Sequence, residues 1–414
     1  MEVVNPRCAA LDVHKKTVVA AVRVHASTGA AREETRTFST MTPDLLALSD
    51  WLGARGVTHV AMEATGEYWK PVYNLLEGQF ELLVVNAHHV KNLPGRKTDV
   101  KDAEWLAQLL QHGLLRASFI PPAEQRDLRE LVRHRTNFVR ERVNIVNRIQ
   151  KLLEGSNIKL ASVASDVMGK SGRAMLDRIV EGQEDPVLLA HLARGSLRGK
   201  IDALEQALSG RIKAHQRVIL AELLRQIDSL DESIGRLEAQ ITDYSVPFEK
   251  AVRHLDTITG VSVTTAQAIV GEIGVDMSHF ATHSHLAAWA GVAPGNHESA
   301  GKRLSGRARP GNKALKRALT EAAWAASHTR DTYLSALYHR LAARRGRKRA
   351  IIGVAHAILV AAYHMIQRDE DYKELGPAHF DSRREERTVQ TCKKRLERIG
   401  YDVHLTKTNV PVAA

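Results

Sequence analysis

Near its amino terminus the chain reads Cys8-Ala9-Ala10-Leu11-Asp12-Val13, an apolar run broken by one carboxylate. Such a short and almost continuous apolar run is typical of a buried β-strand. A lone charge inside a buried strand is costly unless it has a partner, so it usually marks a functional site or a buried ion pair. Asp12 is therefore a candidate site residue, and a structural ion pair with Lys15 or Lys16 is the alternative.

The stretches that follow extend this strand into an α/β domain. Two more strand-like runs, at 17–25 and 31–39, predict a three-stranded meander with the first. Pro43 then suits a first helical turn, and Gly56 suits the end of that helix. The remaining expected elements are a strand from Val57 to Ala64, a helix from Trp69 to Leu76, a strand from Phe80 to Asn86 and a helix from Thr98 to Gln111. By analogy, the order β-β-β-α-β-α-β-α is that of the ribonuclease H and Holliday-junction resolvase fold.

Acidic residues fall where that fold would need carboxylates to hold divalent metal, namely Asp12, Glu63, Asp99 and Asp102. Asp99 and Asp102 are three residues apart, which puts both on one face of a helix that Thr98 can cap. Mg²⁺ ions held by such carboxylates could clamp the attacking and leaving oxygens of a phosphodiester. The alternative is that both aspartates simply enrich a first helical turn, where the helix dipole favours negative charge.

The composition favours a nucleic-acid partner. The 414 residues carry a formal net charge of +12 and a pI near 9.7, which indicates a basic surface suited to phosphates and two or three domains. Basic residues concentrate in two blocks, although such a run is often just a solvated face. One block runs from Arg340 to Arg349, and the other, which holds no acid, comprises Lys302, Arg303, Arg307, Arg309, Lys313, Lys316 and Arg317.

The cysteines and the apolar stretches bear on the compartment. Cys8, expected in the core, and Cys392 provide neither a disulfide framework nor a zinc ligand set, which fits a reducing cytoplasm. The longest apolar stretch, Ala350 to Ile366, is too short and too interrupted by histidine to span a bilayer, so we expect a buried helix there. No signal peptide is seen. The expected location is the bacterial cytoplasm, in association with the nucleoid and with no membrane partner.

A long helical middle separates the acidic region from the basic one. Residues 124–154 form an amphipathic pattern rich in arginine, which ends at Gly155. From Leu223 to Ile241, leucine and isoleucine recur at alternating spacings of four and three residues, which is the seam of a coiled coil. A helical hairpin with 124–154 of the same chain is the alternative to pairing between chains.

Short helices and glycine turns follow Pro247. Residues 255–270 look like a helix-hairpin-helix element, in which a glycine turn presents backbone N–H groups to a phosphate. Ser262 occupies the place where such elements often have a second glycine. An ordinary turn between helices is therefore the alternative.

Several motifs stand in order along the chain: Leu11-Asp12-Val13-His14-Lys15, Met62-Glu63-Ala64-Thr65-Gly66, 97–103, 286–302 and 309–319. The first three resemble the RuvC-like domain of the DEDD-type insertion-sequence transposases, which are bridge-RNA-guided serine recombinases, and the last two resemble their C-terminal domain. The similarity covers roughly residues 8 to 366. The charged tail from about Gln367 to Ala414 lies outside it.

The resemblance implies a catalytic serine that attacks the DNA backbone and holds it as a phosphoserine, while the acidic quartet and Mg²⁺ complete the site. Ser299 is the matching position. Ser305, which precedes Gly306, is the reserve, because the family often has a paired serine followed by glycine whereas this chain has Glu298, Ser299 and Ala300. Without the resemblance, a loop serine beside glycine is usually a turn residue. Nearby cations would stabilise the developing phosphorane charge: Lys302, Arg303 and Arg307.

The resemblance also implies partners: donor and target DNA, a noncoding guide RNA, and further copies of the chain in a dimer to tetramer with a composite site. Helix 124–154 is the expected RNA-facing surface, because RNA duplexes are read mainly through shape and phosphates. Base pairing by a guide would explain the lack of an obvious recognition helix. The expected nucleic-acid-binding residues are Lys302, Arg303, Arg307, Arg309, Lys313, Arg317, Arg133 and Arg140.

The sequence therefore predicts an α/β plus all-α transposase with four regions: a RuvC-like domain at 1–121, a helical coiled-coil region at 122–246, a serine transposase domain at 247–366 and a charged extension at 367–414. Two other classes stay open. One is a metal-dependent nuclease resembling Holliday-junction resolvases, without a serine nucleophile. The other is a DNA-binding protein without catalysis.

Overall fold

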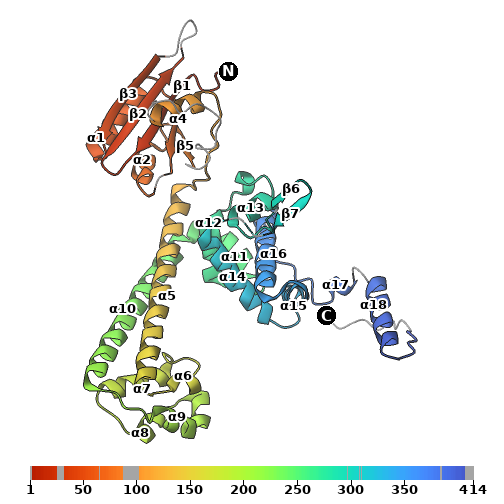
Figure 1. Ribbon diagram of the computed structural model, residues 1–414. Coiled ribbons are helices and arrows are strands. Elements are labelled where there is room, and N and C mark those ends of the chain that lie inside the picture. The colour runs from red at the N-terminus through yellow and green to blue at the C-terminus, as the bar shows by residue number, and fades with distance from the viewer. Residues whose placement is uncertain are drawn as a thin grey trace. The chain divides into compact units, whose positions relative to one another are not determined.

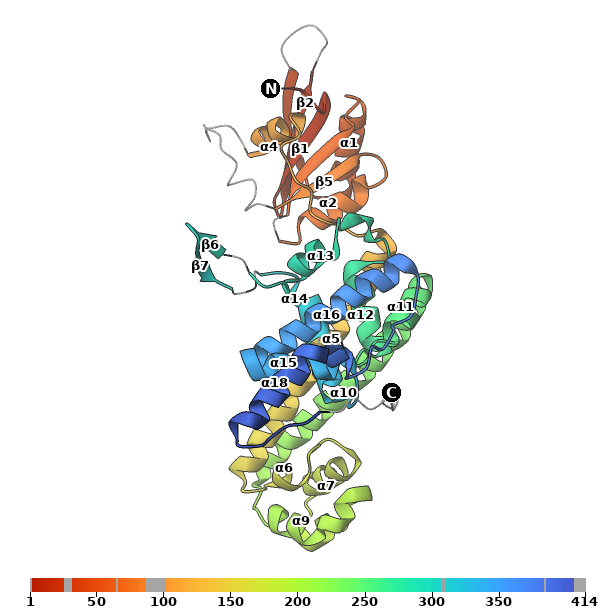
Figure 2. The same cartoon turned by 90° about the vertical axis from the view of Figure 1, so that its right-hand side faces the viewer.

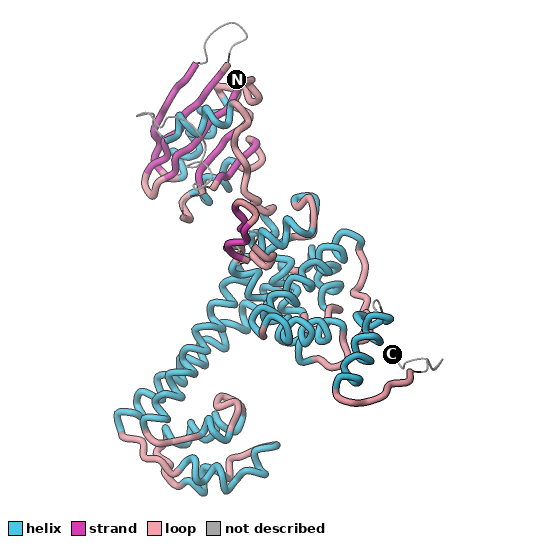
Figure 3. The backbone as a smooth tube through the Cα atoms, turned by 45° about the vertical axis from the view of Figure 1, so that its right-hand side comes forward, coloured by secondary structure: helices cyan, strands magenta, loops and turns pink. Residues whose placement is uncertain are grey.

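The computed structural model describes residues 2–25, 32–64, 66–86, 102–295, 297–306, 308, 310–382 and 385–405. At 297–299, 303–305, 381, 382 and 385–388 it describes the backbone alone. The chain divides into two compact units, Met1–Pro121 and Pro122–Ala414. The first is α/β and the second is mostly helical (Figure 3), which confirms the predicted combination of an α/β region with a helical remainder.

The N-terminal unit is built on a five-stranded mixed sheet (Figure 1). β1 (Arg7–Val13), β2 (Thr17–Val24) and β3 (Arg32–Ser39) form the antiparallel meander that the sequence predicts. β4 (His59–Glu63) pairs parallel with β1, and β5 (Glu81–Val85) pairs parallel with β4, so the strand order is β3-β2-β1-β4-β5. Because β1, β4 and β5 are parallel, their carboxyl ends lie at the same edge of the sheet.

Helices cover both faces of this sheet. α1 (Thr42–Gly53) and α2 (Trp69–Leu76) share one core with Leu11 and Val13 of β1. On the other face, α4 (Asp102–Gln111) packs against Cys8 and Ala10. β1 feeds both cores because successive side chains of a strand point to opposite faces. The predicted order of strands and helices is confirmed for the described residues.

The two cysteines differ sharply in environment. Cys8 is fully buried and its Sγ lies 3.6 Å from the carbonyl oxygen of Ala107, whereas Cys392 is exposed. Burial raises the pKa of the Cys8 thiol to about 11. Since the thiolate is the reactive form, we expect Cys8 to react with iodoacetamide at pH 8 at least ~10²-fold more slowly than Cys392. Mass spectrometry of peptides over a time course measures both rates, and equal rates in the folded protein would contradict the buried position.

The C-terminal unit begins with a hairpin of two long helices, α5 (Ala123–Gly155) and α10 (Ala214–Tyr244). Ion pairs join Arg135 to Glu238 and Arg142 to Asp231, so the partner numbers fall as the α5 numbers rise and the helices are antiparallel. The apolar seam of α10 thus packs on α5 of the same chain, as the hairpin alternative predicts.

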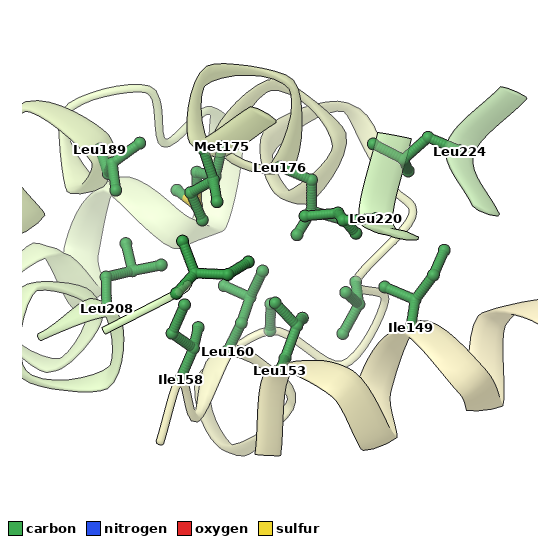
Figure 4. Packing of buried hydrophobic residues seen from close by; sticks show 14 of the residues in the cluster. Ile149, Leu153, Ile158, Leu160, Met175, Leu176, Leu189, Leu208, Leu220 and Leu224 are labelled. Atoms are coloured by element: carbon green, nitrogen blue, oxygen red, sulfur yellow. The ribbon is translucent and has the colours of Figure 1, made fainter. Parts of the chain in front are cut away.

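The far end of this helix pair carries its own hydrophobic core. Figure 4 shows Ile149 and Leu153 of α5 and Leu220 and Leu224 of α10 around side chains of the intervening segment, such as Leu176. That segment folds into short helices: α6 (Leu160–Val163), α7 (Lys170–Val180), α8 (Pro186–Ala190), η1 (Gly195–Lys200) and α9 (Ile201–Leu208).

The rest of the C-terminal unit is a group of helices around α16 (Arg347–Arg368), interrupted by one small hairpin. α16 is long and apolar enough to cross a membrane by length and composition alone. One of its faces, including Ile351, Val354 and Ile358, is buried against neighbouring helices, as we expect for a core helix. The other elements are η2 (Val246–Phe248), α11 (Glu249–Asp256), α12 (Val263–Ile273), η3 (Met277–His279), α13 (His283–Ala290), β6 (His297–Ser299), β7 (Lys302–Ser305), α14 (Lys313–His328), α15 (Tyr333–Arg345), α17 (His379–Ser382) and α18 (Glu385–Arg398).

The turn between α11 and α12 shows why a glycine is needed there. Gly260 has φ +84°, and a Cβ at this position would lie 2.4 Å from the backbone nitrogen of Ala326 in α14. The glycine therefore permits close packing of helices, which favours the ordinary-turn alternative over a phosphate-binding role.

We expect Gly260→Ala to destabilise the C-terminal unit by at least about 2 kcal/mol, because a positive φ is unfavourable for alanine and the new methyl group clashes. Gly235→Ala is the matched control, since nothing lies within 4 Å of a Cβ at this position in α10. The control should stabilise by about 0.5–1 kcal/mol. Scanning calorimetry measures both changes, and an unaltered transition in the Gly260 variant would contradict the close packing.

Candidate active site

Two of the predicted acids lie side by side at one edge of the N-terminal sheet. Leu11 of β1 is in register with Met62 of β4, so Asp12 and Glu63 are the next residues along two adjacent parallel strands. Cys8 and Ala10 of β1 and Ala61 of β4 all contribute to the core under α4. Because every second side chain shares a face, Asp12 and Glu63 face the same side as that core.

Asp102 lies towards the same edge, at the start of α4, the helix that covers this face of the sheet. At the end of α4, Gln111 accepts a hydrogen bond of 3.0 Å from Arg23, whose backbone is paired with Cys8 at the start of β1. The helix therefore runs opposite to β1, and its first residue, Asp102, lies towards the carboxyl end of the strand. Three of the four predicted acids share one face and one edge, while Asp99 lies outside the described residues.

The donor chemistry of this edge fits a hard divalent cation such as Mg²⁺, which prefers carboxylate oxygens. The side chains do not converge on one point, since no three acidic, histidine or cysteine side chains of the described residues lie close enough to hold a metal ion. Asp12 Oδ2 instead lies 3.1 Å from Nε2 of His14, so the close contact of Asp12 is with His14 and not with the expected Lys15 or Lys16. A metal ion at Asp12 would either share the carboxylate with His14 or displace His14, whose side chain is 60% exposed.

Ser299 lies in the C-terminal unit at the tip of a two-stranded hairpin, which projects from the helices in Figure 2. It is paired with Lys302 across a turn in which Ala300 has φ +50° and Gly301 has φ +73°. Two positive φ values define the tight turn that matches the twist of a hairpin. Ser305, the reserve nucleophile, is paired with His297 at the other end of β7, away from the tip.

The predicted cations around this hairpin differ in how far the structure describes them. The side chains of Lys302 and Lys313 are exposed, and Arg317 is half-buried. Arg303 is described in its backbone only, within β7. Arg307 and Arg309 lie outside the described residues. These positions thus remain predicted phosphate contacts.

The arginines of α5 are largely committed to contacts inside the chain. Arg133 donates to both carboxylate oxygens of Glu272, at 2.7 and 2.9 Å, while Arg135 and Arg142 bind acids of α10. Arg140 is exposed. The arginine content of α5 therefore overstates the cationic surface that is available for the predicted RNA contact.

Glu272 and Asn312 take part in a buried network that sequence reasoning missed. Only 4% of the Glu272 side chain is exposed. Its Oε2 accepts a hydrogen bond of 2.6 Å from the Asn312 amide, and Asn312 also caps α14. The signal was present, since Glu272 is a lone acid in the apolar sequence of α12 and is unusual for the same reason as Asp12.

Two family models match this chain. One is described as a transposase, of the DEDD and IS110 type, and matches residues 9–158; the other is described as the transposase IS116/IS110/IS902 family and matches residues 252–339. The first match covers the acidic edge with α5, and the second covers the hairpin with its neighbouring helices. Together they span more than half of the chain.

Relatives that are named as transposases match this chain over most of their own length. The transposase for insertion sequence element IS1111A of Coxiella burnetii is 27% identical over 326 residues, which are 76% of this chain and 79% of the relative. A probable family 20 transposase of Pseudomonas aeruginosa is 26% identical over 268 residues, 64% and 70% of the two chains. The putative transposase y4pF/y4sB of Sinorhizobium fredii is 24% identical over 326 residues, 77% and 75%.

These matches define the chain as an enzyme, a DNA transposase of the insertion-sequence class. It belongs to the IS116/IS110/IS902 family of transposases, of the DEDD type. The predicted family resemblance is thereby confirmed.

Proposed function

We propose that this transposase cuts and rejoins DNA through a covalent phosphoserine on Ser299, with Mg²⁺ held by Asp12, Glu63, Asp99 and Asp102. The observation that supports it most is the shared face and edge of Asp12 and Glu63, with Asp102 on the covering helix. The strand order β3-β2-β1-β4-β5 and the helices on both faces fit a RuvC-like fold for this unit.

The proposed chemistry is a phosphoryl exchange. The Oγ atom of Ser299 forms a bond to phosphorus, the bond from phosphorus to the leaving DNA oxygen breaks, and the serine proton passes to a base as the leaving oxygen gains one. Bound Mg²⁺ would neutralise charge on the attacked phosphate. One phosphoester replaces another, so rejoining needs no external energy source. Lys302 beside Ser299 would bind a phosphate oxygen.

We further propose a noncoding guide RNA, donor and target DNA, and assembly into a dimer or tetramer in the cytoplasm. The net charge of +12 supports binding of phosphate backbones. Arg140, Lys302 and Lys313 are exposed, which supports them as contacts to a phosphate backbone. Arg133 is also exposed, but its guanidinium already binds the carboxylate of Glu272.

A nuclease that uses the acids alone is the second candidate. It is favoured by one observation: the acidic edge belongs to a unit with its own two cores, while the serine lies in the other unit. In this case cleaved DNA would carry no attached protein.

Trapping tests the proposal. The chain is incubated with donor DNA and Mg²⁺, quenched in denaturant, digested and mapped for a peptide that carries a nucleotide. A phosphoserine at Ser299 supports the recombinase, and cleavage without any adduct supports the nuclease. Native purification tests the RNA component, because absence of copurifying RNA, together with recombination unaffected by ribonuclease, would refute the guide.

A further inference from the structure

The segment 292–310, which carries the hairpin, is closed at its base by direct contact of its two flanking backbones. A Cβ added to Gly311 would lie 2.3 Å from the backbone nitrogen of Gly291, so the two glycines pack without side chains between them. The backbone N–H of Asn312 donates to the carbonyl of Trp289 at 3.1 Å. Both ends of the segment are therefore held at one place.

Asn312 links this base to two other elements. Its Oδ1 accepts from the backbone N–H groups of Ala314 and Leu315, which caps α14. Its amide donates to Glu272 at the end of α12. One side chain thus fixes where the hairpin segment ends, where α14 begins, and how both lie against α12.

Glu272 extends the connection to α5. Arg133 forms a bidentate pair with its carboxylate, and Arg129 donates to the backbone carbonyls of Gly271 and Glu272 at 3.0 and 2.7 Å. Burial lowers the pKa of Arg129 to about 10, an effect that the Glu272 charge opposes. Gly274, with φ +73°, lets Gln125 of α5 approach within 2.4 Å of where a Cβ would be. The first turns of α5 and the end of α12 are thus closely packed.

A cap alone explains only part of this arrangement. Serine or aspartate would cap α14 as well as asparagine does, but neither offers an amide donor to Glu272. A buried carboxylate is also costly unless its oxygens are hydrogen-bonded. The choice of residues at 272 and 312 is thus accounted for by the link between α5 and the base of the hairpin.

We propose that Glu272 and Asn312 are positioning residues for strand exchange: they register the base of the Ser299 hairpin against α5. This inference rests on the proposed role of Ser299. It assigns no direct contact with DNA to either residue. It gives a role to the contacts that hold the base of the hairpin against α12 and α5.

The test measures two quantities for variants of the full-length chain: the single-turnover rate of adduct formation and the rate of backbone hydrogen exchange. Asn312→Ser keeps the cap and removes the amide, while N312D places a second carboxylate beside Glu272. In the double variant E272Q/N312D the direction of the hydrogen bond is reversed and the pair is kept. Thr332→Ala is the control, because it removes a different side-chain cap, that of α15, which begins after α14 and outside the segment 292–310.

We expect N312S and N312D to slow single-turnover adduct formation at saturating DNA by about 10- to 100-fold, because a small misplacement of a reacting group lowers the rate by this order. Hydrogen exchange should speed up in the peptides of 292–310 and stay unchanged in those of 316–328. E272Q/N312D should recover only part of the rate, because the new amide nitrogen at position 272 can donate to position 312 but can no longer accept from Arg133. T332A should lower the melting temperature without altering either measurement.

Two outcomes would overturn the inference. One is normal hairpin exchange and a normal rate in N312S. The other is faster exchange throughout α14 with a rate that falls only as the folded fraction falls, which would mean a purely structural role. Failure of the proposed function is recognised separately, because Ser299→Ala would then remain active whatever the exchange measurements show.

Discussion

Ser299→Ala is expected to reduce covalent adduct formation and strand transfer by at least about 10³-fold, because removing the nucleophile of a covalent mechanism removes its first bond-forming step. DNA affinity should change by less than about twofold, since phosphate contacts and not a serine hydroxyl dominate it. Single-turnover kinetics on donor DNA and a filter-binding isotherm measure the two quantities.

Ser305→Ala is the matched control for this result. Ser305 lies on the same hairpin but at the opposite end of β7 from the turn. We expect the control to keep at least about half of the wild-type rate, since its hydroxyl takes no part in the proposed exchange. Loss of activity in Ser305→Ala with full activity in Ser299→Ala would transfer the nucleophile to the reserve position.

Asp12→Asn should lower cleavage by about 10²-fold or more. A bound metal contributes several kcal/mol of transition-state stabilisation, and each 1.36 kcal/mol corresponds to a factor of ten in rate. The amide keeps the shape of the side chain but loses the charge that the metal requires. We expect the melting temperature to change little, because the loss of a like charge beside Glu63 is opposed by a weaker contact of residue 12 with His14. Rates measured across a Mg²⁺ titration, together with calorimetry, check both statements.

Glu81→Gln is the control for charge removal in the same unit. Glu81 is 71% exposed at the start of β5, the end opposite to the acidic edge, and it pairs with His59. Its variant should keep full activity. If Asp12→Asn also cleaves at the wild-type rate over the whole titration, the acidic edge is not a metal site.

Together the Ser299 and Asp12 variants separate the three classes that the sequence leaves open. A phosphoserine recombinase needs both residues. A metal-dependent nuclease tolerates Ser299→Ala but not Asp12→Asn. A DNA-binding protein without catalysis tolerates both, an outcome that would contradict the enzymatic class that the family matches establish.

The N-terminal sheet could be predicted from the sequence because its signals are local. Apolar runs interrupted at Asp12 and near Glu63 predict two strands, and the glycines and prolines between the runs mark their ends. The strand register follows from which face is buried. The parallel pairing of β1 with β4, which brings Asp12 beside Glu63, has no local signal, because β2, β3 and α1 lie between these two strands in the chain. It is predicted only by analogy with a known order of elements.

The partners of the charged residues in the helical unit depend on tertiary structure. The sequence shows how many arginines α5 carries but not their partners, and Arg133 binds an acid 139 residues away. Repeats of leucine and isoleucine in α10 predict an apolar seam without saying which helix covers it. The side chain of Ser299 was singled out by family resemblance alone, since a serine next to a tight turn has no distinctive local pattern.

Different interactions hold the two ends of the helix pair α5 and α10. A hydrophobic core of leucines, isoleucines and a methionine holds one end, and the Arg133–Glu272 ion pair holds the other. The middle of the helix pair is a repeating two-helix surface whose ion pairs are exposed. Deleting or inserting one heptad at matched positions in both helices would preserve the contacts at both ends. The length of this helix pair can therefore change in evolution by roughly 10 Å per heptad without altering the contacts at either end.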